Sequence, residues 1–277
     1  MKNKDKISLL GCGWLGFPLA VSLISKGFIV KGTSTSPEKL LKLEAAGIDP
    51  YLVQFFPLKP DPDLRELLQT DTLIISIPPG RKNNNGTEAY RKMINQLSIL
   101  LPDSNLSRLI FISSTSVYPD LNSVINESTQ LSPSTVSGEL MAEAEMLLST
   151  LPFKVIILRS AGMIGPERLP GKFFSGKTNI PGGGCPVNLI HLDDIIGSIH
   201  CLIENDEASG IYNVCAPSHP TREEFYTLAA KVENLELPHF LPGKMSWKIV
   251  SCERLVNELK FKFKYPSLMN WLNAQLI

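Results

Sequence analysis

The sequence has no long apolar run and no excess of charge. None of its apolar runs approaches the roughly 18 residues of a membrane-spanning helix. The charged start (residues 2–6) leads into an apolar stretch broken by glycine, which is not the pattern of a secretory signal. Lysine plus arginine (27) balance aspartate plus glutamate (27), which argues against a nucleic-acid or membrane-surface partner. We therefore expect a cytoplasmic protein that binds a small molecule.

Motifs for metal, dithiol and hydrolase chemistry are also missing. The five cysteines include no C-x-x-C pair, and the four histidines show no ligand spacing with cysteine or carboxylate partners. Neither a metal site nor a dithiol redox site is therefore expected. The G-x-S-x-G sequence of a serine hydrolase does not occur either.

The chain does contain a regular alternation of short apolar runs with amphipathic segments. With 277 residues, 43% of them hydrophobic, it can bury a full core. Such alternation predicts βαβ units around a parallel sheet. Strands are expected at 7–10, 28–30, 52–53, 72–77, 108–112 and 154–158, and helices at 15–24, 37–47, 63–68, 88–101 and 135–148. The predicted fold class is α/β, a Rossmann-type doubly wound parallel sheet.

The pattern changes beyond the last of these strands. Prolines and glycines between 166 and 184 predict a long loop region, and such loops often border a ligand site. Further on, Asp193 can cap a helix, residues 211–214 have the pattern of a strand, and Thr221 and Glu224 have capping-box spacing.

Two parts are therefore expected. The first is a Rossmann domain over residues 1–161, and the second is a smaller C-terminal substrate lobe over residues 162–277, interleaved with the sheet.

The segment GCGWLG after the first strand fits the pattern G-x-G-x-x-G. In that pattern Gly11 permits the tight turn, Gly13 lets a diphosphate approach the backbone, and Gly16 lets helix and strand pack closely. The helix N-terminus, which includes Trp14 and Leu15, supplies N–H donors. A tight turn without a ligand is the alternative, but the strand before the loop and the amphipathic helix after it favour dinucleotide binding.

The choice between NAD and NADP is expected at the end of the second strand. No acidic residue occurs in residues 31–36, where a carboxylate would bind the ribose of NAD. Ser34, Thr35 and Lys39 could instead bind a 2′-phosphate, which favours NADP slightly over NAD. The alternative is structural, with Ser36 as a helix cap and Lys39 as a solvated residue.

Four motifs occur in an order typical of one family: GCGWLG from Gly11, ISSTSVY ending at Tyr118, HLDD from His191, and IYNV ending at Val214. In that order they resemble the extended short-chain dehydrogenase/reductases, the NAD-dependent epimerase/dehydratase family, and within it the YeeZ-type bacterial members. The resemblance covers nearly the whole chain and implies a Rossmann fold that binds NAD or NADP.

The resemblance also implies site residues. The segment after the central strand carries a catalytic hydroxyl, which falls on Ser114, with Ser113 beside the cofactor. The alternative is that these consecutive hydroxyls only cap a turn after the strand. A tyrosine acid/base and a lysine four residues later fall on Ser137 and Met141, neither of which can transfer a proton in that way.

The substrate implied by the resemblance is a polar small molecule such as a nucleotide sugar. His191 and Arg168 are the candidate substrate contacts, although His191 could be a structural hydrogen bonder and Arg168 a solvated loop charge. Two functions are therefore predicted: an NAD(P)-binding epimerase/dehydratase- or reductase-like enzyme, or a non-catalytic NAD(P)-binding sensor or scaffold. A homodimer is a further expectation, because family members are often dimers.

Overall fold

The computed structural model describes residues 5–54, 62–79 and 84–276. The chain forms two compact units. The first contains Met1–Ser113, Pro133–Leu158 and Glu207–Ile211, and the second contains Ser114–Ser132, Arg159–Asp206 and Tyr212–Ile277. Within the described residues, no helix combines the length and the apolar character needed to cross a membrane.

A seven-stranded sheet in the order β10-β7-β5-β4-β1-β2-β3 organises the first unit, and the last residues of β5, β7 and β10 belong to the second unit. Its strands are β1 (Lys6–Leu10), β2 (Ile29–Ser34), β3 (Asp49–Leu52), β4 (Thr72–Ile75), β5 (Arg108–Ser114), β7 (Lys154–Ser160) and β10 (Gly210–Val214). The pairs β1–β2, β2–β3, β1–β4 and β4–β5 are parallel. The strand order reverses at β1, so the loop after β1 lies at a topological switch point, where α/β sheets bind ligands. The predicted fold class is confirmed.

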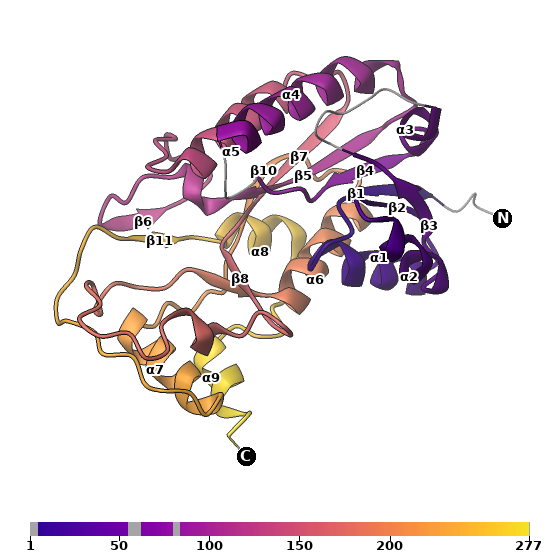
Figure 1. Cartoon of the computed structure of the whole chain (residues 1–277). Coiled ribbons are helices and arrows are strands. Elements are labelled where there is room, and N and C mark those ends of the chain that lie inside the picture. The colour runs from indigo at the N-terminus through magenta and orange to yellow at the C-terminus, as the bar shows by residue number, and fades with distance from the viewer. Residues whose placement is uncertain (1–4, 55–61, 80–83, 277) are drawn as a thin grey trace. The chain divides into compact units, whose positions relative to one another are not determined.

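Helices cover both faces of this sheet. They are α1 (Gly16–Ser25), α2 (Leu40–Ala45), α3 (Pro62–Leu67), α4 (Asn84–Leu100) and α5 (Val136–Leu148), with 3₁₀ turns η1 (Pro37–Lys39) and η2 (Leu101–Asp103). α4 and α5 lie side by side on one face, and α1 and α2 lie on the other (Figure 1).

The first βα unit illustrates why these residues fold as expected. Ile7, Leu9 and Leu10 are buried along β1, and Leu19 and Leu23 recur at helical spacing on the buried side of α1. The helix then ends before Gly27, whose φ of 92° a glycine adopts without strain.

The second unit contains two small parallel sheets and four described helices. Its elements are β6 (Ser123–Ile125), which pairs with β11 (Lys248–Val250), β8 (Gly162–Ile164), which pairs with β9 (Leu189–His191), and α6 (Leu192–Glu204), α7 (Arg222–Val232), α8 (Glu253–Leu259) and α9 (Leu268–Asn273), with 3₁₀ turns η3 (Thr115–Val117) and η4 (Pro170–Phe173). Figure 1 shows β6 and β11 running side by side. Apolar residues of α7, α9 and the strands around them form its core.

Two local expectations for this unit have different outcomes. The capping box of α7 is confirmed, because the Thr221 hydroxyl accepts from Glu224 N–H and the Glu224 carboxylate accepts from Thr221 N–H. The prediction that Asp193 caps α6 is wrong. The cap is His191, two residues earlier, and Asp193 lies in the first turn.

The expected division has a single boundary, between residues 161 and 162, whereas the chain passes between the two observed units several times. Residues 114–132 belong to the second unit although they precede α5, and Glu207–Ile211 returns to the first. Sequence periodicity assigns elements along the chain, whereas these units depend on contacts between distant segments.

Candidate functional site

The glycine loop is fixed by β2, the strand next to β1. Gly11 N–H donates to the hydroxyl of Thr33 at 2.8 Å, and Cys12 N–H donates to the Thr33 carbonyl at 3.0 Å. Thr33 is buried, and Gly11 has a φ of 100°. The two hydrogen bonds therefore hold the turn in a conformation that favours glycine.

Gly16 and Gly13 differ in the space around them. A Cβ added to Gly16 would lie 2.0 Å from the Gly11 carbonyl oxygen and 2.9 Å from Leu9 Cδ2, so this position admits only glycine. A Cβ added to Gly13 would meet nothing within 4 Å. Gly16 thus allows close packing, and Gly13 leaves the backbone open on its exposed side.

The loop has the features that a diphosphate requires. Leu15 precedes α1 as its N-cap residue, with its side chain buried, and the Trp14 side chain is half-buried. N–H groups at the start of a helix have no partner within the helix and carry partial positive charge. The open backbone at Gly13 therefore lies at a helix N-terminus, and these residues fit the pyrophosphate of a dinucleotide.

The predicted ribose side of the site lies at the end of β2. The Ser34 hydroxyl accepts from Ser36 N–H at 3.0 Å and donates to the Ser36 carbonyl at 3.1 Å, so it stabilises the turn before η1. The side chains of Thr35 and Lys39 are exposed. Glu38, a carboxylate just beyond the segment considered in the sequence, is also exposed. Its pKa is lowered by a hydrogen bond to its own backbone and by the Ser36 hydroxyl.

Ser113 and Ser114 have different environments at the end of β5. Ser113 donates to Glu145 Oε1 of α5 at 2.5 Å, and both side chains are buried in the first unit. Ser114, the first residue of the second unit, accepts from Ser116 N–H at 3.1 Å and caps η3. Sequence reasoning missed Glu145 and Thr33 as partners of the candidate site.

Ser137 and Met141, the positions that the sequence motifs predict for the family's tyrosine and lysine, lie on α5. Ser137 is exposed and Met141 is buried, and the Met141 thioether accepts from the Tyr90 hydroxyl at 3.7 Å. Burial raises the pKa of Tyr90 far above the neutral range. A phenol in this state keeps its proton at neutral pH.

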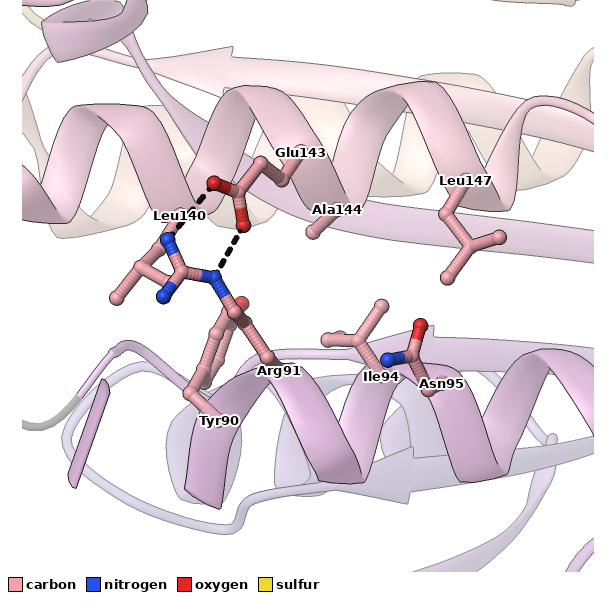
Figure 2. Close-up of a pocket in the computed structure, with 8 residues that line it drawn as sticks. All are labelled: Tyr90, Arg91, Ile94, Asn95, Leu140, Glu143, Ala144 and Leu147. Carbon is pink, nitrogen blue, oxygen red and sulfur yellow. Dashed lines mark hydrogen bonds and ion pairs between the residues drawn. The ribbon is translucent and has the colours of Figure 1, made fainter. Parts of the chain in front are cut away.

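A small pocket lies between the packed helices α4 and α5 of the first unit (Figure 2). Across it, Arg91 donates to both carboxylate oxygens of Glu143 at 2.6 and 2.8 Å, and this pairing lowers the pKa of Glu143. The pocket volume is about 90 Å³, well below the several hundred Å³ typical of small-molecule sites. It is therefore not the cofactor site.

Tyr118, the tyrosine that ends the serine-rich motif, belongs to a buried network of the second unit. Its hydroxyl accepts from Arg159 Nη1 at 2.7 Å and donates to Asn213 Oδ1 at 2.9 Å. Burial raises the pKa of Tyr118, and the Arg159 guanidinium lowers it in part. Both Tyr118 and Arg159 are buried. This arrangement gives Arg159 a structural partner inside the unit.

His191 and Arg168, the candidate substrate contacts, also lie in the second unit. His191 Nδ1 accepts from Asp193 N–H at 3.1 Å, and its ring packs edge-on against Tyr265 at 4.4 Å between centroids. Burial lowers the pKa of His191. Arg168 closes a tight turn by backbone hydrogen bonds with Gly165.

The cysteine of the glycine loop and the possible metal ligands of the chain are also candidates for reactive groups. Burial raises the pKa of the Cys12 thiol to about 12, so this cysteine of the glycine loop stays protonated. Among the described residues, no group of three or more His, Cys, Asp or Glu side chains is placed to hold a metal ion.

Comparisons with known proteins agree with these features. No family model matches the chain. Protein YeeZ of Escherichia coli (strain K12) is 41% identical over 266 residues, which cover 94% of this chain and 96% of YeeZ. An epimerase family protein of Staphylococcus aureus (strain N315) is 29% identical over 131 residues, 42% of each chain.

A solved structure shares the fold. UDP-glucuronic acid 4-epimerase from Bacillus cereus, in complex with NAD, matches with a TM-score of 0.80 at 19% identity, over 97% of this chain and 94% of the epimerase. The identity to YeeZ over nearly the full length goes further, because it establishes common family membership. The chain therefore belongs to the extended short-chain dehydrogenase/reductases of the NAD-dependent epimerase/dehydratase family, as a YeeZ-type member.

Proposed function

We propose that the chain binds NAD or NADP at the loop after β1 and acts on a polar small molecule such as a nucleotide sugar, in an epimerase/dehydratase or reductase reaction. The observation that carries the proposal is the loop geometry. Thr33 holds the turn, Gly16 lets α1 approach β1, and Gly13 leaves open space where a diphosphate can reach the backbone. Family membership and the NAD-bound epimerase of the same fold support it.

The bound nicotinamide would supply hydride transfer, and the protein would position it. Backbone N–H groups at the start of α1 hold the diphosphate, while Ser113 and Glu145 fix the end of β5 on the side of the cofactor. Ser114 acts on the substrate. Its oxygen already accepts from Ser116 N–H, so its own O–H is available to donate to a substrate carbonyl or alcohol.

NADP is proposed as the slightly favoured cofactor. Thr35 and Lys39 are exposed next to the end of β2, where they can donate to a 2′-phosphate. Ser34 contributes by shaping the turn, because its hydroxyl bonds to Ser36.

The substrate roles of His191 and Arg168 stay predictions. In His191 the Nδ1 atom is occupied by the Asp193 N–H, so Nε2 is the ring nitrogen that a substrate would meet.

A non-catalytic sensor or scaffold is the second candidate function. It is supported by the sequence motifs, which predict Ser137 and Met141 at the positions of the family's proton-transfer pair. In the structure Ser137 is exposed and Met141 is buried. It predicts cofactor binding without turnover and a protein partner whose affinity depends on the redox state of the nicotinamide.

Calorimetry tests the cofactor proposal. We expect wild-type protein to bind NADP and NAD, and the Gly13→Ala variant to bind both about tenfold more weakly with unchanged stability, because the new methyl group occupies the diphosphate's side of the loop. Absence of binding at millimolar cofactor, or equal affinity in the variant, would overturn the proposal. Native mass spectrometry of the freshly purified protein checks independently for a co-purified nucleotide.

A turnover assay separates the enzyme from the sensor. The protein is mixed with each cofactor and a panel of UDP-sugars, and nicotinamide absorbance and product sugars are followed. Turnover that falls in Ser114→Ala supports the enzyme, whereas cofactor binding without turnover of any panel member supports the sensor.

A homodimer is also proposed. Ile99 of α4 and Met146 of α5 are each 72% exposed, and the two helices pack against each other. We propose these two side chains as contacts between copies of the chain.

A further inference from the structure

A second pocket, of about 330 Å³, lies entirely within the second unit. Its lining comes from four segments: Asp120 before β6, Cys185 and Asn188 before β9, Arg222 at the start of α7, and Trp247 and Lys248 around the start of β11. Neither His191 nor Arg168 is among its lining residues. The volume is within the range of small-molecule sites.

Arg222 carries a positive charge into this pocket without a carboxylate partner among the described residues. One of its guanidinium nitrogens donates to the Pro181 carbonyl at 2.8 Å. The guanidinium also lies 5.1 Å from the ring centre of Phe174 and 5.7 Å from that of Phe240. These contacts fix the side chain and leave its remaining N–H groups for an acceptor. A fixed guanidinium with free donors is suited to a phosphate or carboxylate.

Lys248 provides a second positive charge. Its ammonium donates to the Tyr118 carbonyl at 2.9 Å and pairs with Asp120 at 2.8 Å. The side chain of Lys248 is 16% exposed, whereas that of Asp120 is 43% exposed. Two cations and one carboxylate therefore line the pocket, so its charge favours an anion.

Trp247 supplies a flat apolar surface whose backbone is held in place. Its N–H donates to the Asn122 side chain at 3.0 Å, and its carbonyl accepts from Asn122 N–H at 2.8 Å. The Lys244 ammonium lies 5.3 Å from the centre of the indole ring. The indole lines the pocket together with Arg222 and Lys248, and a ring of the ligand can lie against it.

Internal hydrogen bonds hold the walls of this pocket. The Asn188 side chain donates to the Lys248 carbonyl and accepts from Val250 N–H, both at 2.9 Å. Cys185 accepts from Met245 N–H through its sulfur and from Arg222 N–H through its carbonyl. Hydrogen bonds thus fix the backbone on both sides of the pocket, which reduces the entropy lost on binding.

We propose that this pocket binds the anionic part of the substrate, a phosphate or carboxylate joined to a ring. Arg222 and Lys248 contact the anion, and Trp247 contacts the ring. The inference rests on the proposed function, because it makes this pocket the substrate-recognition site of the second unit. It assigns that role to residues other than His191 and Arg168.

Binding measurements with simple probes test the inference. UMP, glucose 1-phosphate and D-glucuronate are titrated by calorimetry beside uridine, glucose and inorganic phosphate. We expect at least one ring-bearing anion to bind about tenfold or more tightly than its neutral partner and than inorganic phosphate. The preferred probe distinguishes a nucleotide, a sugar phosphate and a sugar acid as the source of the charge.

Variants assign the binding to the pocket. Arg222→Ala is expected to weaken the preferred probe about tenfold or more, because a charged hydrogen bond is lost, and Arg222→Lys about as much, since lysine lacks the fork of donors. The matched control Lys231→Ala removes an exposed cation of the same helix, α7, outside the pocket, and is expected to bind as wild type. Trp247→Phe is expected to keep most affinity and to lose the change in tryptophan fluorescence on binding. Circular dichroism confirms the fold of each variant.

Other results would overturn the inference. These are equal binding of neutral and anionic probes, no binding of any probe, or an equal loss in Lys231→Ala and Arg222→Ala. Failure of the cofactor proposal looks different, because Gly13→Ala acts on NADP affinity alone and Arg222→Ala on probe affinity alone.

Discussion

The carbonyl oxygen of Gly11 would lie 2.0 Å from a Cβ added to Gly16. Replacing Gly16 with alanine therefore forces the loop away from α1, and we expect the free energy of unfolding to fall by about 3 kcal/mol. Gly13→Ala is the matched control, expected to stay within about 0.5 kcal/mol of wild type because its methyl group meets open space. Urea denaturation followed by circular dichroism measures both. Equal stabilities would contradict the packing role of Gly16.

Thr33 holds the same loop through its hydroxyl. Thr33→Val keeps the shape of the side chain but leaves the Gly11 N–H without its acceptor, and we expect a loss of about 1 to 3 kcal/mol in unfolding free energy. Thr33→Ser retains the hydroxyl and should recover most of the loss. If valine is tolerated as well as serine, the hydrogen bond does not hold the loop.

The fold was largely predictable because its first unit repeats one strong pattern. Buried strands such as β1 and β4 are short and almost wholly apolar, and the helices between them have one apolar face. The glycine loop could also be located, since a special backbone angle and close packing both require glycine. The strand that follows this loop and its helix is predicted at residues 28–30, whereas β2 spans Ile29–Ser34.

Other features depend on contacts that no local pattern reveals. β6 and β11 are three residues each and lie over a hundred residues apart, so neither has enough alternation to predict a strand. The cap of α6 was assigned to Asp193 because aspartate is a common cap, whereas the histidine before it performs that role. The pocket around Arg222 gathers four distant segments, and its lining was invisible in the sequence.

Tyr118 and Arg159 provide a test of the buried network in the second unit. Tyr118→Phe removes the acceptor of a buried guanidinium, and we expect an unfolding free energy lower by about 2 kcal/mol. Tyr212→Phe is the matched control, because Tyr212 bonds to Glu258, which water can reach. Thermal and urea denaturation should rank Tyr118→Phe clearly below Tyr212→Phe, and the reverse order would contradict the network.

The homodimer proposal makes a prediction about α4 and α5. A glutamate in place of Ile99 or Met146 puts a charge where the proposed dimer has an exposed apolar side chain, and we expect the dimer to dissociate to monomer. Leu41→Glu on α2, at 73% exposure, is the control and should leave the mass unchanged. Light scattering after size-exclusion chromatography measures the mass. A wild-type monomer, or a dimer that tolerates both glutamates, would rule out this surface.

Burial of His191 should make the free energy of unfolding depend on pH. Burial holds its pKa below the ordinary value of 6.5, so the unfolded chain binds a proton more readily than the folded chain. The contribution of the neutral ring is therefore complete above about pH 6.5 and is lost as the pH falls from there toward the folded pKa.

His191→Asn preserves a capping side chain but removes the titration, and we expect a smaller fall in unfolding free energy between about pH 7.5 and about pH 5.5. His219, whose pKa burial also lowers, accounts for a remaining slope in the same direction. An undiminished slope in His191→Asn would show that the buried ring does not titrate on unfolding.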